Sequence, residues 1–124
     1  MKAMSKLVGV SSHHQWEVQE LREDREFAVE YAKVAVEGLN NPEERGGSLI
    51  SLRAIAEAYG GLGAVAAQAG ISRESLYRAL SPKGNPTLKT LVAVLKTVGL
   101  RLSVAPEKHV RVRKSKTKDD YAAA

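Results

Sequence analysis

The sequence lacks cysteine altogether and is poor in aromatic side chains. Without cysteine, a chain of 124 residues can form no disulfide, thiolate metal site or cysteine nucleophile. Only one Phe and one Trp accompany an apolar content of 44%, so Leu, Val, Ile and Ala must fill the core. That composition favours closely packed helices over a β-sandwich, and the length suits one domain with a tail.

Long apolar runs are also missing. No stretch approaches the roughly 18 apolar residues that a membrane span needs, and the first ten residues lack the apolar core and cleavage site of a signal peptide. We therefore expect a cytoplasmic protein without membrane contact. His13 and His14 are adjacent and so do not share a helix face, and we expect neither a metal site nor a cofactor.

Acidic residues are nearly absent from the middle of the chain. Residues 61–105 contain six Lys or Arg and a single acid, Glu74, whereas residues 1–60 contain seven basic and ten acidic side chains. Residues 106–124 are basic again, with six Lys or Arg and three acids. This separation of charge indicates that the middle of the chain faces a polyanion, although an ordinary solvated basic surface would give the same pattern.

Apolar spacing predicts five helices followed by a strand. The helices cover approximately residues 21–39, 48–59, 62–69, 73–80 and 87–98. The stripe of the first helix that is expected to face the core consists of Phe27, Tyr31, Val34 and Gly38, widened by Ala28, Ala32, Ala35 and Leu39. Alternating apolar and polar residues at 100–104 predict a short strand, and a similar alternation at 110–112 is typical of a second.

These elements divide the chain into three parts. Residues 1–15 form a flexible leader, residues 16–105 a helical domain, and residues 106–124 a basic tail that we expect to be disordered. The predicted fold class is all-α, with a helix-turn-helix at residues 62–81 and a short C-terminal strand.

The helix-turn-helix prediction rests on the packing of two short helices around a glycine turn. Ala66 is small where the second helix must cross the first, and Gly70 can take the positive φ that the turn requires. Leu76 supplies an apolar anchor, supported by Val65 and Ile71. An αα-corner without a DNA role would satisfy the same packing rule.

The outward side of the second helix favours nucleic acid over a plain corner. A recognition helix enters the major groove with its N-terminal residues nearest the base edges, which places Arg73 for a bidentate guanine contact worth about 1–3 kcal/mol of discrimination. Glu74 would accept from cytosine or orient an arginine, and Tyr77 would contact DNA or cover the core. Arg78 and Lys83 are interpreted as phosphate contacts.

The stretch AAQAGISRESLYRALSPKGNPTLKTLVAVLKTVGLRLSV resembles the HigA-like group of probable addiction module antidote proteins, within the lambda-repressor/Cro-like superfamily. Its specific parts are GISRESLYRALS, the GNP turn and the closing GLRLSV. The preceding helix EFAVEYAKVAVEGL is also similar, so the resemblance covers roughly residues 16–105. The resemblance implies a five-helix lambda-repressor-like fold, a homodimer on double-stranded operator DNA, and a RelE/HigB-like mRNA-cutting toxin as partner.

The resemblance also implies a set of DNA-binding residues. Carried onto this sequence, they are Ser72, Arg73, Glu74, Tyr77, Arg78, Lys83 and Asn85. The superfamily often has a polar residue such as Gln at the start of the first motif helix, where it holds a phosphate. This chain has Leu62, Gly63 and Ala64 there, which leaves only backbone N–H groups for that contact.

Three functions fit these observations. They are a DNA-binding antitoxin of a type II toxin–antitoxin module that represses its own operon, a stand-alone prophage-type repressor, and a protein-interaction module without DNA contact. Catalysis is not expected, because the glycines at 60–63 follow no strand and do not complete a dinucleotide-binding pattern. A toxin would contact the acidic helix at 21–39 or the edge of the strand at 100–104.

Overall fold

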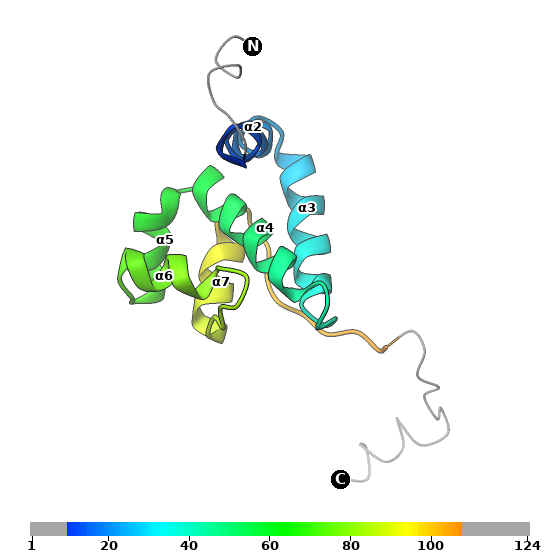
Figure 1. The fold of residues 1–124 in the computed structure, drawn as a ribbon. Helices are drawn as coiled ribbons and strands as arrows, with labels where there is room; N and C mark the ends of the chain where they lie inside the picture. The colour runs from blue at the N-terminus through cyan, green and yellow to red at the C-terminus, as the bar shows by residue number, and fades with distance from the viewer. Residues whose placement is uncertain (1–9, 108–124) are drawn as a thin grey trace, which may run out of the picture.

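The computed structural model of the chain describes residues 10–107, and every regular element in that range is a helix. The helices are α2 Val10–Glu23, α3 Arg25–Gly38, α4 Arg45–Ala58, α5 Gly61–Ala69, α6 Arg73–Ala79 and α7 Leu88–Lys96. The all-α prediction is confirmed for these residues (Figure 1), but six helices stand where five were expected.

The first expected helix, at 21–39, is in fact two helices divided at Asp24. Asp24 has an extended backbone, with φ −129° and ψ 97°, and its carboxylate accepts the Phe27 N–H at 3.0 Å. This side chain therefore ends α2 and caps α3, as acidic residues commonly do at helix starts. A single capping residue inside a continuous apolar pattern explains why the sequence predicted one helix.

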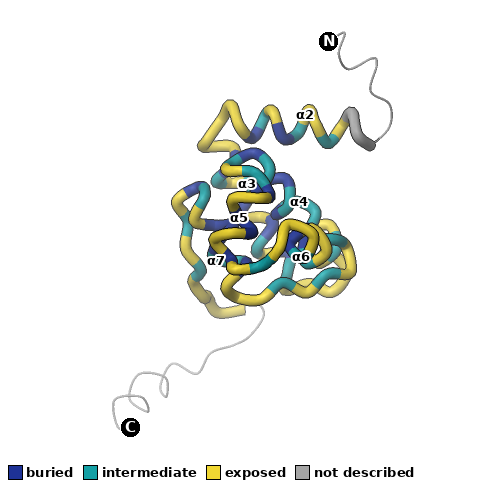
Figure 2. The backbone as a smooth tube through the Cα atoms, turned by 90° about the vertical axis from the view of Figure 1, so that its left-hand side faces the viewer, coloured by how far each residue is buried: buried dark blue, intermediate teal, exposed yellow. Residues whose placement is uncertain are grey.

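Helix α2 begins at Val10, inside the range expected to be a flexible leader. It lies across one end of the bundle, at the top of Figures 1 and 2, and contacts α3 and α4. The Tyr59 hydroxyl donates to the Leu21 carbonyl oxygen at 2.7 Å, and His14 hydrogen-bonds Glu57. These contacts attach α2 to the end of α4. Residues 1–9 and the basic tail from residue 108 lie outside the described range.

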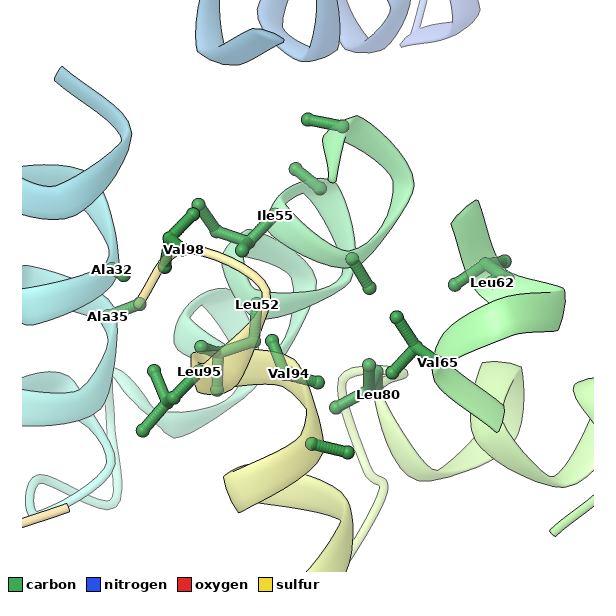
Figure 3. Close-up of a cluster of buried hydrophobic side chains, with 14 of the residues drawn as sticks. Ala32, Ala35, Leu52, Ile55, Leu62, Val65, Leu80, Val94, Leu95 and Val98 are labelled. Carbon is green, nitrogen blue, oxygen red and sulfur yellow. The ribbon is translucent and has the colours of Figure 1, made fainter. Parts of the chain in front are cut away.

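Helix α4 is the centre of the core, because it contacts α2, α3, α5 and α7. Its Leu52 and Ile55 are fully buried between Ala32 of α3 and the side chains Val94 and Val98 at the α7 end (Figure 3). Helices α5, α6 and α7 lie on one side of α4, and α3 lies on the other (Figure 1). One helix thus supports two separate surfaces of the protein.

The face of α3 that meets α4 is narrower than the predicted stripe. The buried residues are Ala28, Ala32, Ala35 and Gly38. Phe27 and Val34, expected in the core, are 42% and 71% exposed. The reason is close helix packing: a Cβ at Gly38 would collide with Ser48 Oγ of α4, so only small side chains fit between the two helices.

The prediction of a strand at residues 100–104 is wrong, because the described residues after α7 contain no strand. Leu100 and Leu102 lie against α3 and α7, beside Ala32 and Leu95, while Val104 is 95% exposed. The alternation therefore reflects one side of an extended segment packing on helices rather than pairing with another strand. The second expected strand, at 110–112, lies outside the described residues.

Apolar helix length bears on the membrane prediction. Among the residues that the structure describes, no single helix is both long and apolar enough to cross a membrane. Helices α4 and α5 reach that composition only when taken together, across a bend of 105°.

Candidate nucleic-acid interface

The corner between α5 and α6 forms at Gly70, as the sequence predicted. Gly70 is left-handed, with φ 73° and ψ 29°. Its N–H donates to the Ala67 carbonyl at 3.1 Å, and the Ile71 N–H donates to the Ala66 carbonyl at 3.0 Å, which is the Schellman pattern of a helix C-terminus. Glycine takes this conformation without the strain that a Cβ would impose, so the turn follows from the local sequence.

Ser72 begins α6 by capping it. The Ser75 N–H donates to Ser72 Oγ at 3.0 Å, and the Ser72 hydroxyl donates in turn to Ser75 Oγ at 3.0 Å. Ser72 is therefore the N-cap of α6. The contact of Ser72 with DNA stays a prediction. The Ser72 hydroxyl that would make this contact already forms hydrogen bonds with Ser75.

The shared core of the corner also matches the spacing in the sequence. Val65, Ala66 and Leu76 are buried, and Ile71 packs against them partly buried. Leu80, at the end of α6, is fully buried as well. Since the apolar side of so short a helix is covered, its opposite side is left to solvent or to a ligand.

The exposed side of α6 carries the four residues singled out by the sequence. Arg73, Glu74, Tyr77 and Arg78 are all exposed, and we call them the α6 face. The nearest polar partner of Arg78 is Ser75 Oγ, 3.4 Å from Nη2. Within residues 10–107, no carboxylate forms an ion pair with the arginines of this face. Their positive charge is therefore available to an anion.

The loop at residues 81–86 is fixed to the end of α6. The Ser81 hydroxyl donates to the Tyr77 carbonyl at 2.8 Å, and the Gly84 N–H donates to the Ser81 carbonyl at 2.7 Å. A Cβ at Gly84 would collide with the Ala79 carbonyl oxygen, so this position requires glycine. Lys83 and Asn85 remain exposed beside it. The structure thus brings both loop residues next to the α6 face.

Two residues near this surface were missed by the sequence analysis. The guanidinium carbon of Arg53, on α4, lies 4.3 Å from the centroid of the Tyr77 ring. Lys89, in the first turn of α7, places Nζ 3.2 Å from the position that a Cβ would take at Gly70. Neither contact is local in sequence. The only signal was that Lys89 belongs to the nearly acid-free region 61–105.

The Tyr77 ring is therefore held by a contact with Arg53 of α4, although the residue is exposed. A guanidinium above an aromatic ring is attractive by about 0.5–1 kcal/mol at exposed sites. Arg53 Nε is buried and has no hydrogen-bond partner among the described residues, so the side chain holds its place at some cost. The arrangement holds the Tyr77 ring of the α6 face against Arg53 of α4.

Over residues 10–107, fold and surface together define a helical domain with a glycine-turned corner and an exposed basic side. The chain belongs to the family described as probable addiction module antidote protein, whose model matches residues 12–106. It is similar to an uncharacterized protein of Haemophilus influenzae, with 52% identity over 40 residues. That match covers 32% of this chain and spans 41% of the relative's length. No solved structure matches the chain significantly.

Proposed function

We propose that this protein is the DNA-binding antitoxin of a type II toxin–antitoxin module. The observation that carries the proposal is the α6 face, where Arg73 and Arg78 are exposed and have no ion-pair partner within residues 10–107, beside a fixed loop that presents Lys83. Membership of the antidote family supports the antitoxin role. The six Lys or Arg of residues 61–105, with a single acid, support a polyanionic ligand.

In the proposed complex, α6 enters the major groove of operator DNA. Arg73, in the first turn, is the candidate reader of guanine, and Glu74 beside it accepts from cytosine or orients the arginine. Arg78 and Lys83 bind phosphates and hold the register, with Asn85 in the same loop. Lys89 adds a cation near the Gly70 turn. The ring of Tyr77, supported by Arg53, packs against the groove wall.

The rest of the proposal follows from the family and from the resemblance in sequence. The antitoxin neutralises a RelE/HigB-like mRNA-cutting toxin encoded beside it and represses the shared operon. A homodimer would read two operator half-sites about one helical turn apart. The proposed protein acts in the cytoplasm, needs no cofactor or metal and is not an enzyme.

A gel shift on the promoter of the gene tests the DNA half. Arg73→Ala combined with Arg78→Ala should weaken specific binding at fixed salt at least about tenfold, because one bidentate base contact alone is worth about 1–3 kcal/mol. The matched control is Lys96→Ala combined with Arg101→Ala, which removes the same charge from exposed positions outside the α6 face. Equal binding by the two double variants would overturn recognition through α6.

The toxin half is tested separately. Expression of the adjoining gene alone should arrest growth, and co-expression with this chain should restore it. DNA binding without such rescue would favour the stand-alone repressor. Rescue without DNA binding would favour a protein-interaction module built on the same helical corner.

A further inference from the structure

A groove lies between α3 and the start of α4, on α3's exposed side. Its volume is about 600 Å³, and we call it the α3–α4 groove. Its apolar lining comes from Phe27, Tyr31 and Val34, and its acidic lining from Glu30, Glu43 and Glu44. The three apolar residues belong to the stripe that the sequence marked as core. The fold leaves Phe27 and Val34 exposed and Tyr31 half-buried.

The apolar wall of the groove is held in place. The Phe27 and Tyr31 rings meet edge to face with centroids 5.7 Å apart. The Tyr31 hydroxyl donates to Glu17 of α2. Burial and this hydrogen bond raise the pKa of Tyr31 to about 12. Val34 stands free beside them, 71% exposed. Clustered exposed apolar side chains of this kind commonly mark sites of protein interaction.

The charge of the groove is entirely negative. Three glutamates line it, and no lysine or arginine is among the described residues that do so. Lys33 Nζ reaches Glu30 at 3.4 Å from the neighbouring turn, but both side chains are exposed, and such pairs are weak. An apolar floor with acidic edges fits a partner segment that carries an apolar anchor flanked by basic side chains.

We infer that the α3–α4 groove binds a basic segment of the toxin, through an apolar anchor seated on Phe27, Tyr31 and Val34. This inference rests on the proposed function and adds the surface and the chemistry of the partner. A second copy of the chain fits less well, because a two-fold contact would bring the same three carboxylates face to face. Nucleic acid is repelled by the same charges.

Binding measurements on the chain of 124 residues test the inference. The probe is the purified product of the adjoining gene, titrated calorimetrically. Val34→Lys, and separately Glu30→Lys combined with Glu43→Lys, should each weaken binding at least about tenfold, and the double variant should flatten the salt dependence. The controls are Val104→Lys, and Glu37→Lys combined with Glu107→Lys, all at exposed positions outside the groove.

The occupant is identified by crosslinking. Because the chain has no cysteine, Val34→Cys provides a unique attachment point for a benzophenone maleimide, and Val104→Cys provides the control. Crosslinks from position 34 to the toxin, absent from position 104, support the inference. Crosslinks to a second copy or to residues 108–124 overturn it.

Failure of the inference can be told from failure of the proposed function. If the groove variants bind the toxin as tightly as their controls, the groove assignment is wrong while the antitoxin role stands. If the wild-type chain binds no toxin and gives no growth rescue, the groove assignment and the antitoxin role are both wrong. Circular dichroism of each variant excludes unfolding as the cause of a loss, and the exposed positions of the substitutions favour an unchanged fold.

Discussion

The α6 face and the α3–α4 groove lie on opposite sides of α4 and differ in charge and in construction. The first presents exposed arginines with a nearby lysine, and the second presents exposed apolar side chains among three glutamates. Both leave unusual side chains in solvent, but the sign of the charge separates their ligands. A basic face suits a polyanion, and an acidic apolar groove suits a basic protein segment.

The two surfaces are also supported in different ways. The α6 face depends on local backbone devices, namely the Gly70 turn, the Ser72 cap and the Gly84 loop. The groove depends on the close approach of α3 to α4 at Gly38 and on the hydrogen bond from Tyr31 to α2. Substitutions can therefore be aimed at one surface at a time, although the two supports meet where Pro82 of the loop lies against Gly46, next to the groove residue Gly47.

Among substitutions that should disturb one surface and leave the other intact, we expect the largest loss of stability at Gly84. In Gly84→Ala, the new Cβ would collide with the Ala79 carbonyl oxygen and lie 2.5 Å from that of Arg78. Because backbone atoms cannot move aside easily, we expect a loss of about 1–3 kcal/mol in the free energy of unfolding, measured by urea denaturation. DNA binding should weaken as the loop carrying Lys83 shifts, whereas toxin binding at the groove should persist.

Gly63→Ala is the matched control for Gly84→Ala. Gly63 lies within α5, and a Cβ there would meet nothing within 4 Å. Alanine should therefore raise the free energy of unfolding by roughly 0.5–1 kcal/mol through helix propensity. If both substitutions changed stability in the same direction, the steric account of the Gly84 loop would be wrong.

A smaller effect is expected on the groove side, at Tyr31. Tyr31→Phe keeps the ring that forms the wall and removes the hydrogen bond to Glu17. We expect a loss of about 1 kcal/mol in the free energy of unfolding and weaker toxin binding, with DNA binding unchanged. Unaltered stability would mean that water replaces the hydroxyl contact at no cost.

The pH dependence of this variant sharpens the same point. The pKa of Tyr31 is raised from its usual 10.0 to about 12 in the folded chain. A raised pKa means that the folded state holds the proton more tightly, so this contribution is complete below about pH 10 and is lost as the pH rises towards 12. Wild-type stability should therefore fall towards that of Tyr31→Phe across this range, measured by denaturation at each pH.

The sequence predicted the α6 side far better than the α3 side, for a physical reason. The Gly70 turn, the Ser72 cap and the buried Leu76 obey rules that span a few residues. Helical periodicity on α3 instead offered two adjacent stripes, one aromatic and one of alanines. Only the tertiary approach at Gly38 selects the smaller, and periodicity cannot show that distance. Both stripes were therefore assigned to the core, although Phe27 and Val34 are exposed.

The sequence also could not predict contacts between segments that are distant along the chain. Arg53 reaches Tyr77 from another helix, and Lys89 reaches the Gly70 turn from α7. The break at Asp24 was missed because a single capping side chain interrupts an otherwise continuous helical pattern. The prediction of a strand at 100–104 was wrong because alternating apolar and polar residues show only that one side of the segment is buried.

The smallest effect on stability, and the most specific on function, is expected at Arg53. Arg53→Met keeps much of the packing volume while removing the cation above Tyr77. The lost attraction of about 0.5–1 kcal/mol is offset because the buried Nε that lacks a partner also disappears. The free energy of unfolding should therefore change by less than about 0.5 kcal/mol. DNA affinity in the gel shift should fall several-fold, whereas toxin binding should stay the same. Tyr77→Phe retains the ring beneath the guanidinium and serves as the control. If Arg53→Met bound DNA as tightly as the wild-type chain, the support that α4 gives the α6 face would have no part in DNA binding.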